Sequence, residues 1–142
     1  MDKLSKLIKA TCSVKGIGAY KIGFELVIPF GMEEIIKTIR KHTKLPIIYD
    51  HQKAGTDVPF TGEKFAKVCK DAEVDAVILF PQAGPATERE WIKACFKAGL
   101  GVIVGGEMTH EQYLKSDGGF LEDNAPQRMY EIAIESGVTE FV

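Results

Sequence analysis

The chain has 142 residues, of which 45% are hydrophobic and 27% charged, and its formal net charge is −2. This length supports one ordinary domain with a hydrophobic core, and the composition is typical of a soluble globular protein. The small net charge, without a basic run interleaved with aromatic residues, argues against a nucleic-acid partner. No apolar run is long enough to span a bilayer, and Met1–Lys6 lacks the apolar core of a signal peptide, so we expect no membrane partner.

The three cysteines, Cys12, Cys69 and Cys95, are odd in number and do not have the spacing of a metal site. Reduced thiols of this kind are typical of proteins in a reducing compartment. We therefore predict a cytoplasmic protein without structural disulfides or a metal site.

Strand-like and helix-like segments alternate along the chain. We predict strands at residues 19–23, 46–50, 74–80, 100–105 and 138–142. We predict helices at residues 4–11, 32–39, 62–72, 87–98 and 125–136, a short helix or turn at 109–115, and a loop from residue 116. Asn124 is expected to cap the last helix, which Pro126 begins and Gly137 ends.

This alternating order favours a parallel sheet with helical crossovers, and the strands read as nearly continuous apolar runs, as strands covered on both faces do. Five strands would suit an open flavodoxin-like sheet, whereas a closed eight-stranded barrel needs at least about 200 residues. The chain also ends within an apolar strand at Phe141 and Val142. We therefore expect it to be part of a longer β/α protein.

Charged and polar residues gather where the predicted strands end. These residues are Lys21, Asp50, Lys53, Gln82 and Glu107. Ligands bind at the carboxyl ends of parallel strands, so this placement predicts that the five side chains surround one mouth. Acids and lysines are costly to bury together, which favours a chemical role for them.

Four segments of the chain carry a resemblance to a known family. They are Tyr20–Gly23, the set Asp50, Lys53, Asp57, Pro59 and Thr61, the loop Phe80–Gly84, and the stretch Glu107–His110. In this order they resemble the motifs of orotidine 5′-phosphate decarboxylase, and the resemblance runs from about residue 5 to residue 142. It implies an incomplete TIM-barrel domain over residues 1–142, without the first strand and the last two β/α units.

The spacing between the two aspartates differs from the family motif. The chain reads Asp50-x-x-Lys53-x-x-x-Asp57, which is one residue longer in each gap. Positions three apart on a strand face opposite ways, so Asp50 and Lys53 converge only if a turn begins near His51 or Gln52. The family's ribose-binding aspartate has no counterpart here, and its phosphate site would lie beyond the last residue.

The resemblance implies decarboxylation of orotidine 5′-monophosphate to uridine 5′-monophosphate in pyrimidine synthesis, without metal or cofactor. It assigns catalytic roles to four residues and substrate binding to three: Lys21, Asp50, Lys53 and Asp57, and Thr61, Thr109 and Gln82. In the family the second aspartate and the following threonine reach a neighbouring subunit's site, which implies a homodimer with shared active sites.

Other interpretations remain open at this point. A magnesium-dependent keto-gulonate phosphate decarboxylase or hexulose phosphate synthase has a similar strand end, and a non-catalytic fragment or binding module could keep the same residues. Thr61 and Thr109 could simply cap helices, and Lys21 could be a strand-end lysine in solvent. His51 is interpreted as structural or solvent-facing, and Trp91 as a core residue.

Overall fold

A computed structural model describes residues 1–52 and 54–142 of the chain. Its single sheet contains five parallel strands, β1 (Tyr20–Gly23), β2 (Ile47–Asp50), β3 (Ala76–Leu79), β4 (Gly101–Val104) and β5 (Glu140–Phe141). The helices are α1 (Asp2–Thr11), α2 (Phe24–Phe30), α3 (Met32–Arg40), α4 (Thr61–Asp71), α5 (Pro85–Lys97) and α6 (Ala125–Glu135), with a 3₁₀ helix, η1 (Lys115–Asp117). No helix in the part of the chain that the structure describes is long and apolar enough to cross a membrane.

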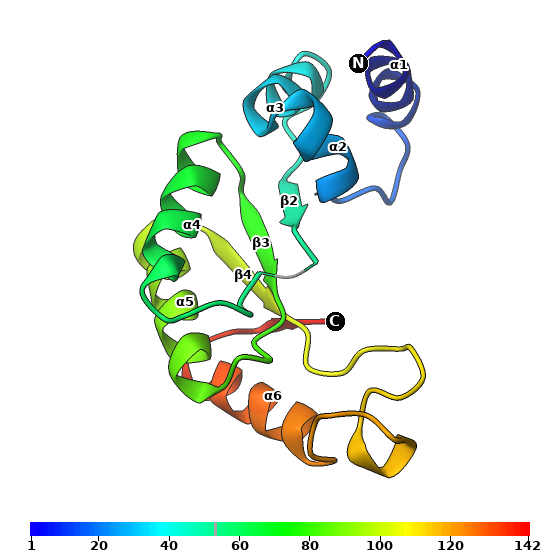
Figure 1. Ribbon diagram of the computed structural model, residues 1–142. Coiled ribbons are helices and arrows are strands. Elements are labelled where there is room, and N and C mark those ends of the chain that lie inside the picture. The colour runs from blue at the N-terminus through cyan, green and yellow to red at the C-terminus, as the bar shows by residue number, and fades with distance from the viewer. Residues whose placement is uncertain (53) are drawn as a thin grey trace.

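The strand order distinguishes the two expected architectures. Each strand pairs with the next strand in the sequence, in the order β1-β2-β3-β4-β5. A flavodoxin-like sheet would instead place its first strand between the second and the third. The flavodoxin-like alternative is therefore wrong, and the sequential order is that of a TIM-type barrel. Figure 1 shows α4, α5 and α6 along one side of the curved sheet.

The core lies between the sheet and the helices. The strand side chains that face it are Ile22, Ile47, Tyr49, Val77, Leu79, Val102 and Val104, all at most 4% exposed. Alternate residues point to opposite faces of a strand, so Lys21, Ile48 and Asp50 lie on the other face, which would be the inside of a barrel. The helices contribute three isoleucines from α3, small residues from α4 and α6, and both large and small residues from α5, among them Trp91 and Ala94.

A polar cluster closes the amino-terminal edge of the sheet. Arg40, at the end of α3, donates from Nη2 to Oδ2 of Asp75 over 2.6 Å and from Nη1 to the carbonyl of Leu45 over 2.7 Å. The same Oδ2 accepts from the backbone N–H of Ile47 at 2.7 Å. One carboxylate thus joins α3, β2 and the residue before β3.

The predicted elements are present, with four differences. Helix α2 is not predicted by the sequence pattern, because it contains Pro29 and no single apolar face. Residues 109–112 form a bend and the short 3₁₀ helix η1 follows at Lys115–Asp117, within the segment expected to be a loop, so no helix begins at Thr109 and the capping role considered for it is wrong. Helix α4 begins at Thr61, whose hydroxyl donates to the Val58 carbonyl at 2.7 Å and does not cap the helix.

The fourth difference concerns the last part of the chain. Asn124 occupies the N-cap position of α6, but its side chain makes no capping hydrogen bond. The last strand is shorter than expected and covers Glu140 and Phe141 only. The prediction of a strand after α6 is therefore confirmed in type and place but not in length.

Candidate functional site

The site begins with an ion pair between neighbouring strands. In the register of β1 and β2, Lys21 lies opposite Ile48 and Gly23 lies opposite Asp50, so the lysine and the aspartate share a face of the sheet. Lys21 Nζ donates to Asp50 Oδ2 over 2.8 Å. The Asp50 side chain is 9% exposed and that of Lys21 is 59% exposed, so the pair keeps one polar side towards solvent. The structure thus brings Lys21 and Asp50 into contact at this edge.

A tight turn follows Asp50. Its Oδ1 accepts from the backbone N–H of Gln52 at 3.0 Å, and Gln52 has a left-handed backbone with φ of 66°. A turn thus begins where the long spacing would need one for Asp50 and Lys53 to converge, and that convergence stays a prediction. Lys53 lies outside the described residues. Beyond it, Gly55 (φ of 90°) lies against the backbone of Phe80, whose N–H donates to the Ala54 carbonyl over 2.7 Å.

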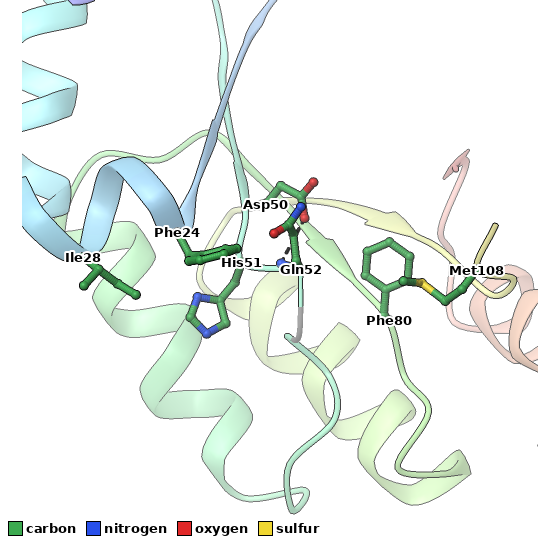
Figure 2. A pocket seen from close by; sticks show the side chains of 7 residues that line it. All are labelled: Phe24, Ile28, Asp50, His51, Gln52, Phe80 and Met108. Atoms are coloured by element: carbon green, nitrogen blue, oxygen red, sulfur yellow. Dashed lines mark hydrogen bonds between the residues drawn. The ribbon is translucent and has the colours of Figure 1, made fainter. Parts of the chain in front are cut away.

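A cavity of about 480 Å³ opens beside this turn. Its walls come from α2 and from the loops after β2, β3 and β4, and the lining residues are Phe24, Ile28, Asp50, His51, Gln52, Phe80 and Met108. Figure 2 shows Asp50 and Gln52 between the α2 residues on one side and Phe80 with Met108 on the other. Gly105 leaves room for the Phe80 ring in this wall, because a Cβ at position 105 would lie 2.3 Å from that ring.

A second cavity, of about 340 Å³, shares Met108 with the first. In its wall, the side-chain amide of Gln82 donates to Tyr113 Oη over 3.2 Å, and Tyr113 Oη donates to the Gly106 carbonyl over 2.6 Å. Burial raises the pKa of Tyr113, while the Gln82 hydrogen bond opposes that rise, so the hydroxyl keeps its proton and can serve as this donor. Gln82 thus joins the loops after β3 and β4.

Comparison with known proteins places this geometry in a family. Residues 1–142 match the sequence model of the "Orotidine 5′-phosphate decarboxylase / HUMPS family". The chain belongs to this family. It is also similar to a crystal structure of orotidine 5′-monophosphate decarboxylase from Methanocaldococcus jannaschii, with a TM-score of 0.75 and 27% identity. That match covers 98% of this chain and 61% of the other, so the chain spans less than two thirds of its structural relative. The TIM-barrel fold is thereby confirmed.

Among the described residues that the decarboxylase resemblance implies, Asp57 and Thr61 do not line the Asp50 cavity. Asp57 Oδ1 accepts from the N–H of Val58, and the Asp57 carbonyl accepts from the Thr87 hydroxyl at 2.8 Å. Thr61 starts α4, and neither it nor Asp57 lines the cavity. Thr109 is exposed beside Met108, which does line it. Within the described residues, the structure therefore unites Lys21 with Asp50 only, and their roles in a decarboxylase remain predictions.

The family motifs do not indicate the apolar part of the cavity. Phe24 and Ile28 belong to the unpredicted helix α2, and Phe80 and Met108 lie just beyond strands. Phe80 and Met108 do lie within two segments that resemble the family, Phe80–Gly84 and Glu107–His110. Their position beside the polar residues Gln82 and Thr109 could have indicated that they line the site. His51 is interpreted from the sequence as structural or solvent-facing. It is exposed and bonds to Tyr49, in agreement with that interpretation, and it also lines the cavity.

Proposed function

We propose that the protein containing this chain decarboxylates orotidine 5′-monophosphate to uridine 5′-monophosphate, as part of pyrimidine synthesis. The observation that carries the proposal is the Lys21–Asp50 pair at 2.8 Å, at the carboxyl edge of a parallel sheet and beside a cavity of about 480 Å³. Membership of the decarboxylase family supports it. Asp50 is the proposed central catalytic residue.

The proposed role of Asp50 is electrostatic. A substrate carboxylate placed next to the Asp50 carboxylate is repelled, and at about 4 Å the repulsion is roughly 4 kcal/mol for an effective dielectric constant of 20. The carboxylate becomes neutral carbon dioxide as it leaves, so the repulsion disappears in the transition state. An interaction that differs between ground and transition state accelerates the reaction, whereas uniform binding does not. The short bond to Lys21 and the bond from the Gln52 N–H hold Asp50 in place.

Loss of carbon dioxide leaves an electron pair on the pyrimidine ring carbon, which must take up a proton. We assign this proton donation to Lys53 and the stabilisation of the developing charge to the same ammonium group. Lys21 would orient Asp50 and bind the ribose hydroxyls. Thr109 and Gln82 would bind the pyrimidine from the loops after β4 and β3.

A shared active site would explain why Asp57 and Thr61 lie apart from Asp50. We propose that both act in the site of a second subunit of a homodimer. Two exposed apolar side chains lie between them, Val58 at 45% and Phe60 at 69%, which supports a protein contact on this surface. Sedimentation should detect a dimer, and Phe60→Asp should shift it towards the monomer; a strictly monomeric protein would contradict the shared site. We further propose a cytoplasmic location.

A second candidate is a magnesium-dependent sugar-phosphate lyase of the same family. The description of the matching family names HUMPS beside the decarboxylase, so membership of the family is compatible with more than one activity. Such an enzyme would use the Asp50 edge with a divalent cation and an enediolate. A third possibility is that this chain alone is a binding module with little turnover, because remote phosphate contacts that contribute to kcat/KM would come from elsewhere.

The deciding experiment follows absorbance during incubation with orotidine 5′-monophosphate, with and without a chelator. We expect uridine 5′-monophosphate to form equally in both, and only slowly when the 142-residue chain is used alone. A requirement for magnesium together with turnover of a sugar phosphate would favour the second candidate. Any longer form of the protein should be assayed in parallel, since an inactive 142-residue chain alone does not exclude the reaction.

A further inference from the structure

His51 occupies a different part of the cavity wall from Asp50. Both residues line the cavity of about 480 Å³, and His51 lies beside Phe24 and Ile28 of α2. In Figure 2 the His51 ring and the Asp50 carboxylate point away from each other. A ligand group next to Asp50 would therefore not be the group that His51 contacts.

Tyr49 holds the His51 ring in position. The Tyr49 side chain is 4% exposed and stacks on Phe65 of α4 with ring centroids 6.3 Å apart. Its hydroxyl lies 2.5 Å from His51 Nδ1, and the two ring centroids are 5.6 Å apart. The exposed imidazole is thus fixed by a tyrosine that is itself anchored in the core.

This contact bears on which nitrogen of His51 carries the proton, because the role of the ring nitrogen as donor or acceptor depends on the tautomer. Burial, followed by the nearby Cys69 and Asp50 groups, raises the pKa of Tyr49 to about 12, so the hydroxyl keeps its proton at neutral pH. The described residues offer that proton one acceptor, His51 Nδ1. When Nδ1 of a neutral imidazole accepts, the ring proton is on Nε2. His51 therefore presents an N–H donor at Nε2.

We propose that His51 is a ligand-binding residue, whose Nε2–H donates to a hydroxyl or phosphoryl oxygen on the part of the nucleotide remote from Asp50, and that Tyr49 is its positioning residue. The nucleotide class rests on the proposed function, whereas the hydrogen-bonded pair rests on the geometry of Tyr49 and His51. The ligand chemistry follows from the donor, because a neutral Nε2–H needs an oxygen acceptor and not a cation.

The first test needs no ligand. Long-range ¹H–¹⁵N NMR of the protein reports which imidazole nitrogen is protonated. We expect His51 to be the Nε2–H tautomer, and Tyr49→Phe to produce a mixture of both tautomers. Protonation of Nδ1 in the unsubstituted protein would overturn the inference whatever the protein's activity, and so would a Tyr49→Phe spectrum without change.

The second test measures binding of uridine 5′-monophosphate and of uridine by calorimetry. A matched pair of variants separates the two ring nitrogens, because the amide of Asn superposes on Nδ1 and that of Gln reaches towards Nε2. We expect His51→Asn and His51→Ala to weaken binding about tenfold, the loss of one hydrogen bond, and His51→Gln to restore most of it. Circular dichroism serves as the folding control for all three.

The two probes locate the acceptor. An equal loss with both probes identifies a nucleoside hydroxyl, and a loss confined to uridine 5′-monophosphate identifies a phosphoryl oxygen; either supports the inference. Unchanged affinity of folded His51→Asn and His51→Ala for both probes would overturn it while leaving the proposed function intact. Failure of both the 142-residue chain and any longer form to bind either probe would overturn the proposed function and the nucleotide assigned to His51, whereas the Tyr49–His51 pair would still be decided by NMR.

Discussion

Two acid–base pairs join neighbouring β/α units at opposite ends of the same sheet. At the amino-terminal edge, Arg40 and Asp75 contact each other and the backbone of β2, so both side chains are committed to hydrogen bonds within the protein. At the carboxyl edge, Lys21 and Asp50 contact each other, but Asp50 also faces a cavity. Equivalent chemistry thus closes the fold at one end and leaves an aspartate facing a cavity at the other, the end at which β/α barrels bind their ligands.

Of the substitutions that test this difference between the two edges, the largest effect is expected for Asp50 at the carboxyl edge. Asp50→Asn keeps an oxygen for the Gln52 N–H but removes the negative charge. We expect kcat for orotidine 5′-monophosphate to fall by about 10³-fold or more, with KM unchanged or lower, because ground-state repulsion is lost. Steady-state kinetics of a catalytically competent longer form would measure this, and an Asp50→Asn enzyme with normal kcat would remove the proposed mechanism.

The second prediction concerns a buried acid that belongs to neither pair. Glu88 of α5 is 1% exposed, and its Oε1 has no hydrogen-bond partner among the described residues. Burial raises the pKa of Glu88 from 4.5 to about 7, against the opposing charge of Arg89. A raised pKa in the folded state means that its contribution to stability is fully present below pH 4.5 and is lost as pH rises through 7.

Chemical denaturation at pH 5 and pH 8 measures this loss. The free energy of unfolding should decrease by up to about 3 kcal/mol between these conditions, and Glu88→Gln should flatten the dependence. Other groups contribute equally to both proteins, so the difference between the two curves isolates Glu88. Parallel curves for the two proteins would show that this carboxyl ionises normally.

The amino-terminal edge provides the third prediction. Asp75→Ala leaves Arg40 without its carboxylate and the N–H of Ile47 without its acceptor. We expect the free energy of unfolding to fall by about 2 kcal/mol, with little change in affinity for uridine 5′-monophosphate. Denaturant unfolding and calorimetry of one sample test both parts. An Asp75→Ala variant that is stable but fails to bind would show that the amino-terminal edge contributes to ligand binding and not only to stability.

The smallest effect serves as a baseline. Lys67 and Asp71 form an i,i+4 ion pair on the exposed face of α4. Exposed pairs of this kind contribute about 0.3–0.5 kcal/mol, so Lys67→Ala should change stability and ligand affinity hardly at all. Thermal unfolding at low and high salt would measure it. A loss as large as that expected for Asp75→Ala would show that position in the fold does not determine the value of these pairs.

The sequence predicted the order of strands and helices because their apolar periodicity is strong. It placed Lys21, Asp50, Gln82 and Glu107 at one edge, since residues at the ends of parallel strands share an edge. The structure pairs Lys21 with Asp50, but Gln82 lines the second cavity and Glu107 lines neither cavity. The sequence could not predict α2, where Pro29 and exposed apolar residues give no helical pattern, or therefore the wall made by Phe24 and Ile28. The role of Tyr49 as a partner of His51 depends on side-chain directions beyond the strand end, which periodicity does not specify.

The backbone hydrogen bond from Phe80 to Ala54 has a consequence for redesign. This bond joins the loop after β3 to the loop after β2. The Gln82–Tyr113 hydrogen bond joins the loop after β3 to the loop after β4. Replacing one of these loops with that of a relative would remove the hydrogen bond that joins it to the neighbouring loop. Substrate preference in such a scaffold should therefore be exchanged most successfully by grafting all three loops together.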